Sequence, residues 1–444
     1  MRRQKILPGL AAILLLVALV RYLPRWIPAL DYRSGFLPRP DAVEWVWTGA
    51  LQPTSIRMVA KLTRPSESVR LLLSRDEGLA NPRRSAAHTA SQASGLGLSI
   101  TAAGLEPGTR YVYALEIDGE VDNKRRGTFR TPQEGPQSFT LAFGSCARTG
   151  SSHPVFETIR RHDPLFFLHL GDLHYRNIAR NDPQRFARAF DTVLRSPAQS
   201  RLFRSVPIAY VWDDHDYGPD NSDSTSPSRA AARQAYRRWT PHYPLAEGEG
   251  GAIYQAFTIG RVRFLLTDSR SERSPRSDPD GPDKTVLGTA QKAWLERQFL
   301  AAKERYPLIV WANSFPWIAP TRRGADDWGG YAHERLEIAR FIEANQIRGV
   351  IMLSGDAHML AIDDGSHNRL TETGGPGFPV MHAAPLDQRG SRKGGPYSSD
   401  IARRAGQFGL MKVEDNGGSQ IVVHWSGRNH KDRELIRHRF IVTE

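Results

Sequence analysis

Five apolar segments between residues 139 and 358 each lead into a short polar cluster, and this repeated pattern constrains the fold more than any other feature. The pairs are Phe139–Phe143 with Gly144-Ser145-Cys146, Leu165–Leu170 with Gly171–Tyr175, Val206–Trp212 with Asp213–Asp216, Leu308–Trp311 with Asn313-Ser314, and Val350–Leu353 with Ser354–His358. Short apolar runs are typical of strands buried in a sheet. The carboxyl ends of such strands form the ligand crevice of an α/β sheet. We therefore expect the five polar clusters to meet at one sheet edge.

Helical stretches separate these strands. They include Val155–Arg161, Pro183–Leu194, Thr289–Lys303 and His333–Asn345. Alternation of strand and helix predicts a layered α/β domain, which we place at residues 136–444.

Residues 41–135 have a different pattern, with short alternating segments divided by turn residues. The segments are Val43–Thr48, Ser55–Leu62, Val69–Ser74, Leu98–Ala102, Arg110–Ile117 and Gly127–Arg130. This spacing predicts a β-sandwich. The stretch Leu105–Tyr113, with its Pro107-Gly108 turn, resembles the fibronectin type III pattern. We find no chemistry-bearing cluster here and interpret the domain as a support module.

The amino terminus has the pattern of an export segment. Arg2, Arg3 and Lys5 precede the uncharged run Ile6–Val20, and no small-residue cleavage site follows. We interpret residues 1–30 as an uncleaved signal-anchor helix that attaches the protein to a membrane, with a cleaved signal peptide as the alternative. Residues 31–40 are the linker that follows. The main part of the chain is then periplasmic or on the cell surface.

Charge and cysteine content narrow the function further. The net charge of +13 favours anionic partners such as phosphate esters. No dense Lys/Arg block with interleaved aromatic residues occurs, so dedicated nucleic-acid binding is not expected. Cys146 is the single cysteine, which excludes an intrachain disulfide and leaves a thiol that is buried, reactive or a metal ligand.

The residue types in the clusters suit a pair of cations. Asp172 and Tyr175 are three positions apart after one strand, and Asp356 and His358 are two positions apart after another. Carboxylate, amide and phenol oxygens are hard ligands, whereas thiolate and imidazole are softer. Two adjacent cations can clamp a phosphate and generate a hydroxide nucleophile.

The ordered motifs G-S-C, G-D-x-x-Y, W-D-D-H-D, N-S and S-G-D-x-H resemble those of the PhoD-like (alkaline phosphatase D) family, within the calcineurin-like metallophosphoesterases. Two further landmarks agree, Leu266–Arg270 and Gln407–Leu410. The resemblance implies an α/β fold: a four-layer α/β/β/α metallophosphoesterase sandwich preceded by the fibronectin type III-like β-sandwich and the apolar helix. The sequence departs from the family pattern around Tyr175, at Asp220 and at Arg369–Thr373. These departures leave every motif ligand in place but change the residues around the ligands.

Carried over by position, the resemblance implies a complete ligand set for Fe(III) and Ca(II). Cys146, Asp172, Tyr175 and His358 would hold the ferric ion, and Asp172 would bridge to a calcium ion completed by Asp214, Asn313 and Asp356. His215 would assist the reaction beside Asp172 as the second catalytic residue. Asp213 and Asp216 would support the ligands by hydrogen bonds, and Arg148, His174 and Arg176 are candidates for substrate binding. We expect Arg270 to pair with a nearby carboxylate.

These expectations describe an exported metal-dependent phosphoric ester hydrolase. It would cleave phosphate monoesters or diesters by direct attack of a metal-bound hydroxide. Three alternatives stay open: a nucleotidase or phospholipase-type diesterase on the same fold, a membrane-anchored binding protein with an inactive phosphatase-like domain, and a hydrolase that forms a phosphoserine or phosphothreonine intermediate. The sequence does not indicate the oligomeric state.

Overall fold

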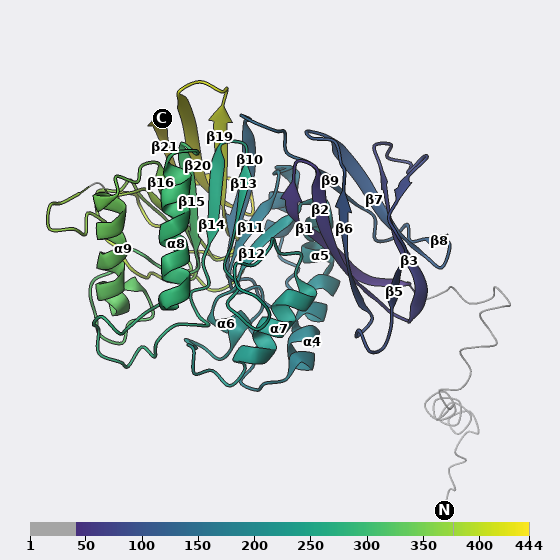
Figure 1. Cartoon of the computed structure of the whole chain (residues 1–444), viewed down its shortest axis with the longest axis horizontal. Coiled ribbons are helices and arrows are strands. Elements are labelled where there is room, and N and C mark those ends of the chain that lie inside the picture. The colour runs from purple at the N-terminus through teal and green to yellow at the C-terminus, as the bar shows by residue number, and fades with distance from the viewer. Residues whose placement is uncertain (1–40, 376, 444) are drawn as a thin grey trace, which may run out of the picture. The chain divides into compact units, whose positions relative to one another are not determined.

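A nine-stranded sheet organises the computed structural model, which describes residues 41–375 and 377–443. Its strand order is β21-β20-β19-β10-β11-β12-β1-β2-β6 (Figure 1). The bounds are β21 Glu434–Thr443, β20 Gln420–Asn429, β19 Gln407–Asp415, β10 Phe139–Gly144, β11 Phe167–Leu170, β12 Ile208–Val211, β1 Val43–Gln52, β2 Ser55–Leu62 and β6 Gly97–Ala103. Strands β10, β11 and β12 are parallel, so their carboxyl ends lie at the same edge.

A second sheet of six strands brings the other polar clusters to their strand ends. Its order is β13-β14-β15-β16-β18-β17. The bounds are β13 Gln255–Ile259, β14 Val262–Leu266, β15 Leu308–Asn313, β16 Val350–Ser354, β18 Val380–Ala383 and β17 Leu360–Asp363. Strands β14, β15, β16 and β18 are parallel. One buried core joins the two sheets, with Leu168 and Val211 from the first and Phe264, Val310 and Leu353 from the second.

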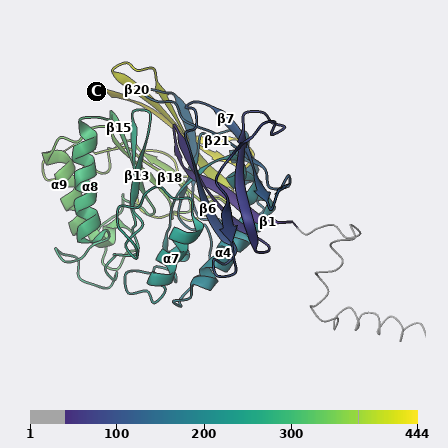
Figure 2. The same ribbon diagram turned by 45° about the vertical axis from the view of Figure 1, so that its right-hand side comes forward.

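Helices pack on the remaining faces. The bounds are α3 Val155–Arg161, α4 Pro183–Arg195, α5 Pro197–Ser205, α7 Arg229–Trp239, α8 Gly288–Lys303, η1 Trp328–Tyr331 and α9 Ala332–Ala344. The first four share a core with the nine-stranded sheet, in which Phe190 and Phe203 meet Trp47. Helices α8 and α9 share another core with the six-stranded sheet, and two views show them side by side (Figures 1 and 2).

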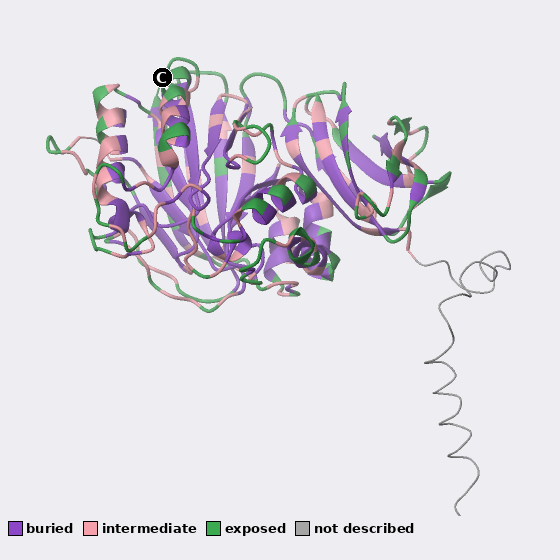
Figure 3. Ribbon diagram, turned by 60° about the horizontal axis from the view of Figure 1, so that its bottom comes forward, coloured by how far each residue is buried: buried purple, intermediate pink, exposed green. Residues whose placement is uncertain are grey.

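The start of α4 shows how the sequence places a helix boundary. Asp182 accepts a hydrogen bond from the backbone N–H of Gln184, and Pro183 occupies the first helical turn. The Asp182 side chain satisfies one unpaired donor of the helix start, and Pro183 has no N–H group that needs a partner. Strands of the two large sheets are mostly buried, whereas the helices expose one face (Figure 3).

All six strands predicted for residues 41–135 are present. Three of them, β3 Ser66–Ser74, β7 Arg110–Ile117 and β9 Gly127–Arg130, belong to a third sheet with β4 Arg83–Arg84, β5 His88–Ala90 and β8 Glu120–Val121. The other three, β1, β2 and β6, extend the nine-stranded sheet through the pairing of Gly49 with Ile208. A Cβ atom at position 49 would lie 2.4 Å from the carbonyl oxygen of Ile208, so this junction requires glycine.

The signal-anchor segment and linker predicted for residues 1–40 lie outside the described residues. Within the described part of the chain, no helix has the length and apolar character needed to cross a bilayer.

Candidate metal centre

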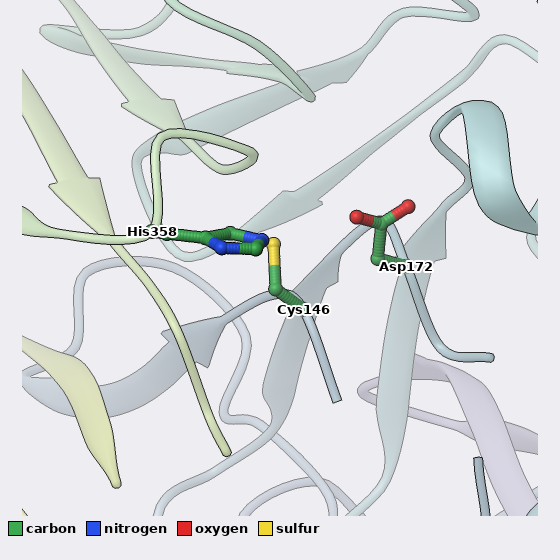
Figure 4. Close-up of side chains that lie close together, drawn as sticks. All are labelled: Cys146, Asp172 and His358. Atoms are coloured by element: carbon green, nitrogen blue, oxygen red, sulfur yellow. The ribbon is translucent and has the colours of Figure 1, made fainter. Parts of the chain in front are cut away.

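The structure brings side chains from three distant motifs to one place. The Sγ atom of Cys146, a carboxylate oxygen of Asp172 and an imidazole nitrogen of His358 lie within 4.8 Å of one another. Figure 4 shows these three side chains arriving from separate segments, with their ligand atoms turned toward a common space. Asp172 also belongs to a second group, with Asp214 and His215, that meets the same distance limit. The carboxylate of Asp172 is therefore shared between two neighbouring sets of ligand atoms.

The backbone turns sharply where the strands deliver these residues. Cys146, Asp172, Asp356 and His358 have φ angles of 64°, 57°, 55° and 51°. Residues other than glycine rarely adopt this left-handed conformation. Such strain is concentrated at functional sites, where surrounding contacts hold it in place. Here it aims side chains into the space beyond the strand ends.

Tyr175 joins the first group through its hydroxyl. Its Oη atom donates a hydrogen bond to Oδ2 of Asp172 over 2.8 Å and lies 3.1 Å from Nε2 of His358. Burial raises the pKa of Tyr175, and the carboxylate of Asp172 raises it further. The Tyr175 hydroxyl therefore contacts two members of the group.

Three buried carboxylate oxygen atoms in this cluster have no hydrogen-bond partner within the described residues, and one of them, Oδ1 of Asp214, lies 3.7 Å from the guanidinium of Arg270. They are Oδ1 of Asp172, Oδ1 of Asp214 and Oδ2 of Asp356. Burial raises the pKa of Asp172 well above its usual value, and the neighbouring Asp214 adds to the effect. Burying several unpaired carboxylates is costly unless opposite charge compensates them. The converging oxygen atoms, thiol and imidazole are thus a donor set that fits bound cations.

His215 lies against this cluster on a short helix, α6 Asp214–Tyr217. Its ring packs on that of Tyr175 with centroids 4.1 Å apart. Its Nδ1 atom lies 2.5 Å from Oδ1 of Asn177, and Nε2 lies 3.6 Å from Oδ1 of Asp220. The imidazole is therefore held in one orientation by ring packing and by contacts at both nitrogens.

Asn313 ends β15 and pairs with Ser354, the last residue of the adjacent strand β16, and Asp356 follows two residues later. The Asn313 side chain donates to the carbonyl of Phe315, and its Oδ1 accepts from Nε1 of Trp328 over 3.3 Å. Oδ1 of Asp356 forms an ion pair with Nζ of Lys393 at 2.5 Å. The structure thus places both residues at the carboxyl ends of their strands, as predicted.

Asp213 and Asp216 hold the loop that carries Asp214. The carboxylate of Asp216 accepts hydrogen bonds from the backbone N–H groups of His174 and Asp213. Asp213 pairs with the fully buried Arg270, which also contacts Asp326. Burial alone would raise the pKa of Asp326, but the guanidinium groups of Arg270 and its neighbour lower it to about 2. The carboxylate partner expected for Arg270 is therefore present.

The loop of residues 386–389, which was not predicted from the sequence, contacts both the Cys146 segment and His358. The backbone N–H of Leu386 donates to the carbonyl of Ser145, next to Cys146. The carbonyl oxygen of Arg389 lies 2.8 Å from Nδ1 of His358, which orients Nε2 toward Tyr175. Orientation of a ligand histidine through its second nitrogen is common at metal sites. These are backbone contacts of residues 386–389, and no side-chain motif marks them in the sequence.

The three candidates for substrate binding lie in different environments. Arg148 donates from its backbone N–H to Asp387 over 2.5 Å. His174 is buried against Phe190, and burial lowers its pKa to about 3. The guanidinium of Arg176 donates to the hydroxyl of Thr192. A role in substrate binding stays a prediction for Arg148, His174 and Arg176.

Comparison with known proteins assigns a family to this fold and cluster. The model of the PhoD-like phosphatase family matches residues 141–393, and the chain belongs to that family. Alkaline phosphatase D of Bacillus subtilis is 25% identical over 311 residues, which cover 58% of this chain and 52% of that protein. Tartrate-resistant acid phosphatase type 5 of Sus scrofa is 24% identical over 178 residues, 38% of this chain and 48% of that protein. The chain spans about half the length of these relatives.

Solved structures support the same fold. A structure of PhoD has a TM-score of 0.73 at 17% identity and covers 90% of this chain and 93% of its own. A purple acid phosphatase, PPD1 of yellow lupin (Lupinus luteus), has a TM-score of 0.61 at 12% identity and covers 91% of this chain and 75% of its own. The chain therefore has a sheet-rich, mixed α/β fold similar to those of PhoD and this purple acid phosphatase.

Proposed function

We propose that this protein is a two-metal phosphoesterase that hydrolyses phosphate monoesters or diesters. The observation that carries the proposal is the position of the buried Asp172 carboxylate, which lies within 4.8 Å of the Cys146 thiol and a His358 nitrogen in one group and of Asp214 and His215 in a second. Membership in a phosphatase family and the fold shared with PhoD support it. The names of the relatives refer to phosphatases, and the substrate of this chain is part of the proposal.

The chain supplies ligands for two different cations. Cys146, Tyr175 and His358 would hold Fe(III), which suits thiolate, phenolate and imidazole. Asp214, Asn313 and Asp356 would hold Ca(II), which prefers oxygen ligands. Asp172 would bridge them because it belongs to both groups. When bound, the two cations would polarise the phosphoryl oxygens and lower the pKa of a water molecule.

His215 has the geometry of a proton donor to the leaving oxygen. Asn177 holds its Nδ1 atom, so Nε2 is the nitrogen that remains for the substrate. In the protonated ring, the Nε2–H group can interact with Asp220, 3.6 Å away, and then pass its proton to the departing alkoxide. Asp213 and Asp216 fix the loop and keep His215 and Asp214 in place during this transfer.

The finer architecture and the location of the protein are proposals of the same kind. We propose a four-layer α/β/β/α arrangement for the catalytic part and a fibronectin type III-like sandwich for residues 41–135, supported by the separate cores and the third sheet. Export to the periplasm or cell surface, with attachment through residues 1–30, is proposed from the sequence pattern alone.

The Asp172→Asn variant tests the function. It should lower phosphate ester hydrolysis more than about a hundredfold, because it removes the shared carboxylate charge. Asp118→Asn is the matched control: Asp118 has a similar φ of 50° but lies in the β7–β8 turn of the third sheet. Asparagine tolerates this conformation, so both variants should fold, as circular dichroism would verify.

Full activity of Asp172→Asn would contradict the proposed mechanism. Elemental analysis of the purified protein tests the cations, and an Fe(III) ion bound by Tyr175 and Cys146 should absorb visible light. A pure, active, colourless and iron-free protein would exclude the iron assignment. A panel of monoester, diester and phospholipid substrates separates the phosphatase from the nucleotidase and phospholipase-type alternatives.

A further inference from the structure

A cleft of about 410 Å³ lies beside the candidate metal centre. Three of its lining residues are connected to the cluster, two of them by direct contact and the third through Arg270. The backbone N–H of Asn221 donates to Oδ2 of Asp214 over 2.6 Å, and Lys393 pairs with Asp356. Asp326 reaches the cluster through the guanidinium of Arg270. A molecule bound at the metal centre can therefore extend into this cleft.

Positive side chains outnumber negative ones around the cleft. Arg276, Arg322 and Arg392 are exposed lining residues, and within the described residues their guanidinium groups make no hydrogen bond or ion pair. They come from three separate segments of the chain, which the fold brings together around the cleft.

The two carboxylates of the cleft are already engaged. Asp326 pairs with two buried arginines, Arg270 and Arg273. Asp327 accepts a hydrogen bond from the backbone N–H of Gly329. Three guanidinium groups of the cleft therefore remain available to a ligand, and each can bind a phosphate with two parallel hydrogen bonds.

We propose that this cleft binds a second phosphate group of the substrate, separate from the phosphate that is hydrolysed. The inference rests on the proposed phosphoesterase function and specifies its substrate class: phosphate esters that carry a further phosphate. Arg276, Arg322 and Arg392 act as specificity-determining residues, because they contact the distant phosphate and not the reacting atoms. Lys393 lies between the two positions, next to Asp356.

Matched substrate pairs test this proposal. One pair is AMP and adenosine 3′,5′-bisphosphate, and the other is thymidine 5′-(4-nitrophenyl phosphate) without and with a 3′-phosphate. Release of phosphate or nitrophenolate gives kcat/KM for each, and the ratio within a pair measures the preference for the second phosphate. The wild-type ratio should favour the doubly phosphorylated member by about tenfold, the effect of one charge-assisted interaction of roughly 1.4 kcal/mol.

Arg322→Gln and Arg392→Gln should each move the ratio toward one, mainly through KM. Arg323→Gln is the matched control, since Arg323 is also exposed but does not line the cleft, and its ratio should equal that of the wild type. A wild-type ratio of one, or an unchanged ratio in both cleft variants, would overturn the inference while leaving the phosphoesterase function intact. Absence of hydrolysis of all four substrates and of the simple ester panel would instead remove the proposed function, and this inference with it.

Discussion

The Nε atom of Arg270 donates a hydrogen bond to Oδ1 of Asp213 over 2.5 Å, and both side chains are fully buried. The same guanidinium contacts Asp326 through its other two nitrogens. Arg270 therefore neutralises two carboxylates directly behind the loop that carries Asp214.

Replacement of Arg270 should destabilise the protein strongly. Arg270→Met keeps much of the side-chain volume but leaves the buried Asp213 without its cation and Asp326 with Arg273 alone, at a cost of about 3–5 kcal/mol. Urea unfolding followed by circular dichroism would measure this change. The control is Arg340→Met, which removes an exposed ion pair with Glu372 and should change stability little. Equal stability of the two variants would contradict the role given to Arg270.

The ion pair of Lys393 with Asp356 predicts an effect on cation affinity. A cation held by Asp356 would lie close to the Lys393 ammonium group, and the two positive charges would repel each other. Lys393→Met should therefore tighten binding of calcium to the metal-free protein about tenfold. Isothermal titration calorimetry would measure it. Lys412→Met serves as control, because Lys412 pairs with Glu414 within β19; weaker calcium binding by Lys393→Met would refute this explanation.

His169 predicts a loss of stability in acid. Burial lowers its pKa from 6.5 to about 3, and neither ring nitrogen has a hydrogen-bond partner within the described residues. The unfolded chain therefore binds a proton that the folded chain does not, so the free energy of unfolding falls as pH decreases from 6.5 toward 3.

His169→Phe should remove this contribution, which is about 2 kcal/mol between about pH 6.5 and about pH 5. Urea unfolding at both pH values would show a smaller difference for the variant than for the wild type. His88 in β5 is partly exposed, and His88→Phe should retain the wild-type difference. The prediction fails when His169→Phe and wild type lose the same stability.

At the junction of β1 with β12, position 49 has no room for a side chain. An added Cβ atom would lie 2.4 Å from the carbonyl oxygen of Ile208 and 2.5 Å from that of Pro241. Gly49→Ala should therefore cost about 1–3 kcal/mol of stability. Thermal unfolding would detect it. Gly248→Ala, where an added Cβ meets nothing within 4 Å, should unfold at the wild-type temperature; a matching temperature for Gly49→Ala would show that the junction can relax.

Sequence reasoning predicted the parts of the fold that depend on local pattern. The strand ranges of Ser55–Leu62 and Arg110–Ile117 and the helix Val155–Arg161 agree with the structure to the residue. Strands β19, β20 and β21 were not predicted, although two of them are ten residues long. Strand β19 depends on pairing with β10, a long-range contact that no local periodicity reports, and β20 and β21 are then added beside it in sequence order.

The candidate site also contains residues that the local sequence pattern predicted and residues that it did not. The clusters of Cys146, Asp172 and His358 were predicted to meet because each follows an apolar strand, and the family resemblance selected these three as ligands of one ion. Their proximity in the structure agrees with the first prediction. Asn177 and Lys393 were missed, since each touches the cluster from a loop whose course depends on the complete fold. A sequence shows which side chains can bind an ion more readily than it shows which loops hold them in position.

Because the sheet is continuous across β1 and β12, residues 41–135 and residues 136–443 cannot be exchanged as independent domains. The indole of Trp45 donates to Asp191 on α4, and that of Trp47 donates to the carbonyl of Trp239 at the end of α7. A fragment that starts at residue 136 would lack both indoles and leave β12 as a bare strand edge, which invites aggregation. A transfer of residues 41–135 to another protein would need to include helices α4 and α7, which these indoles contact.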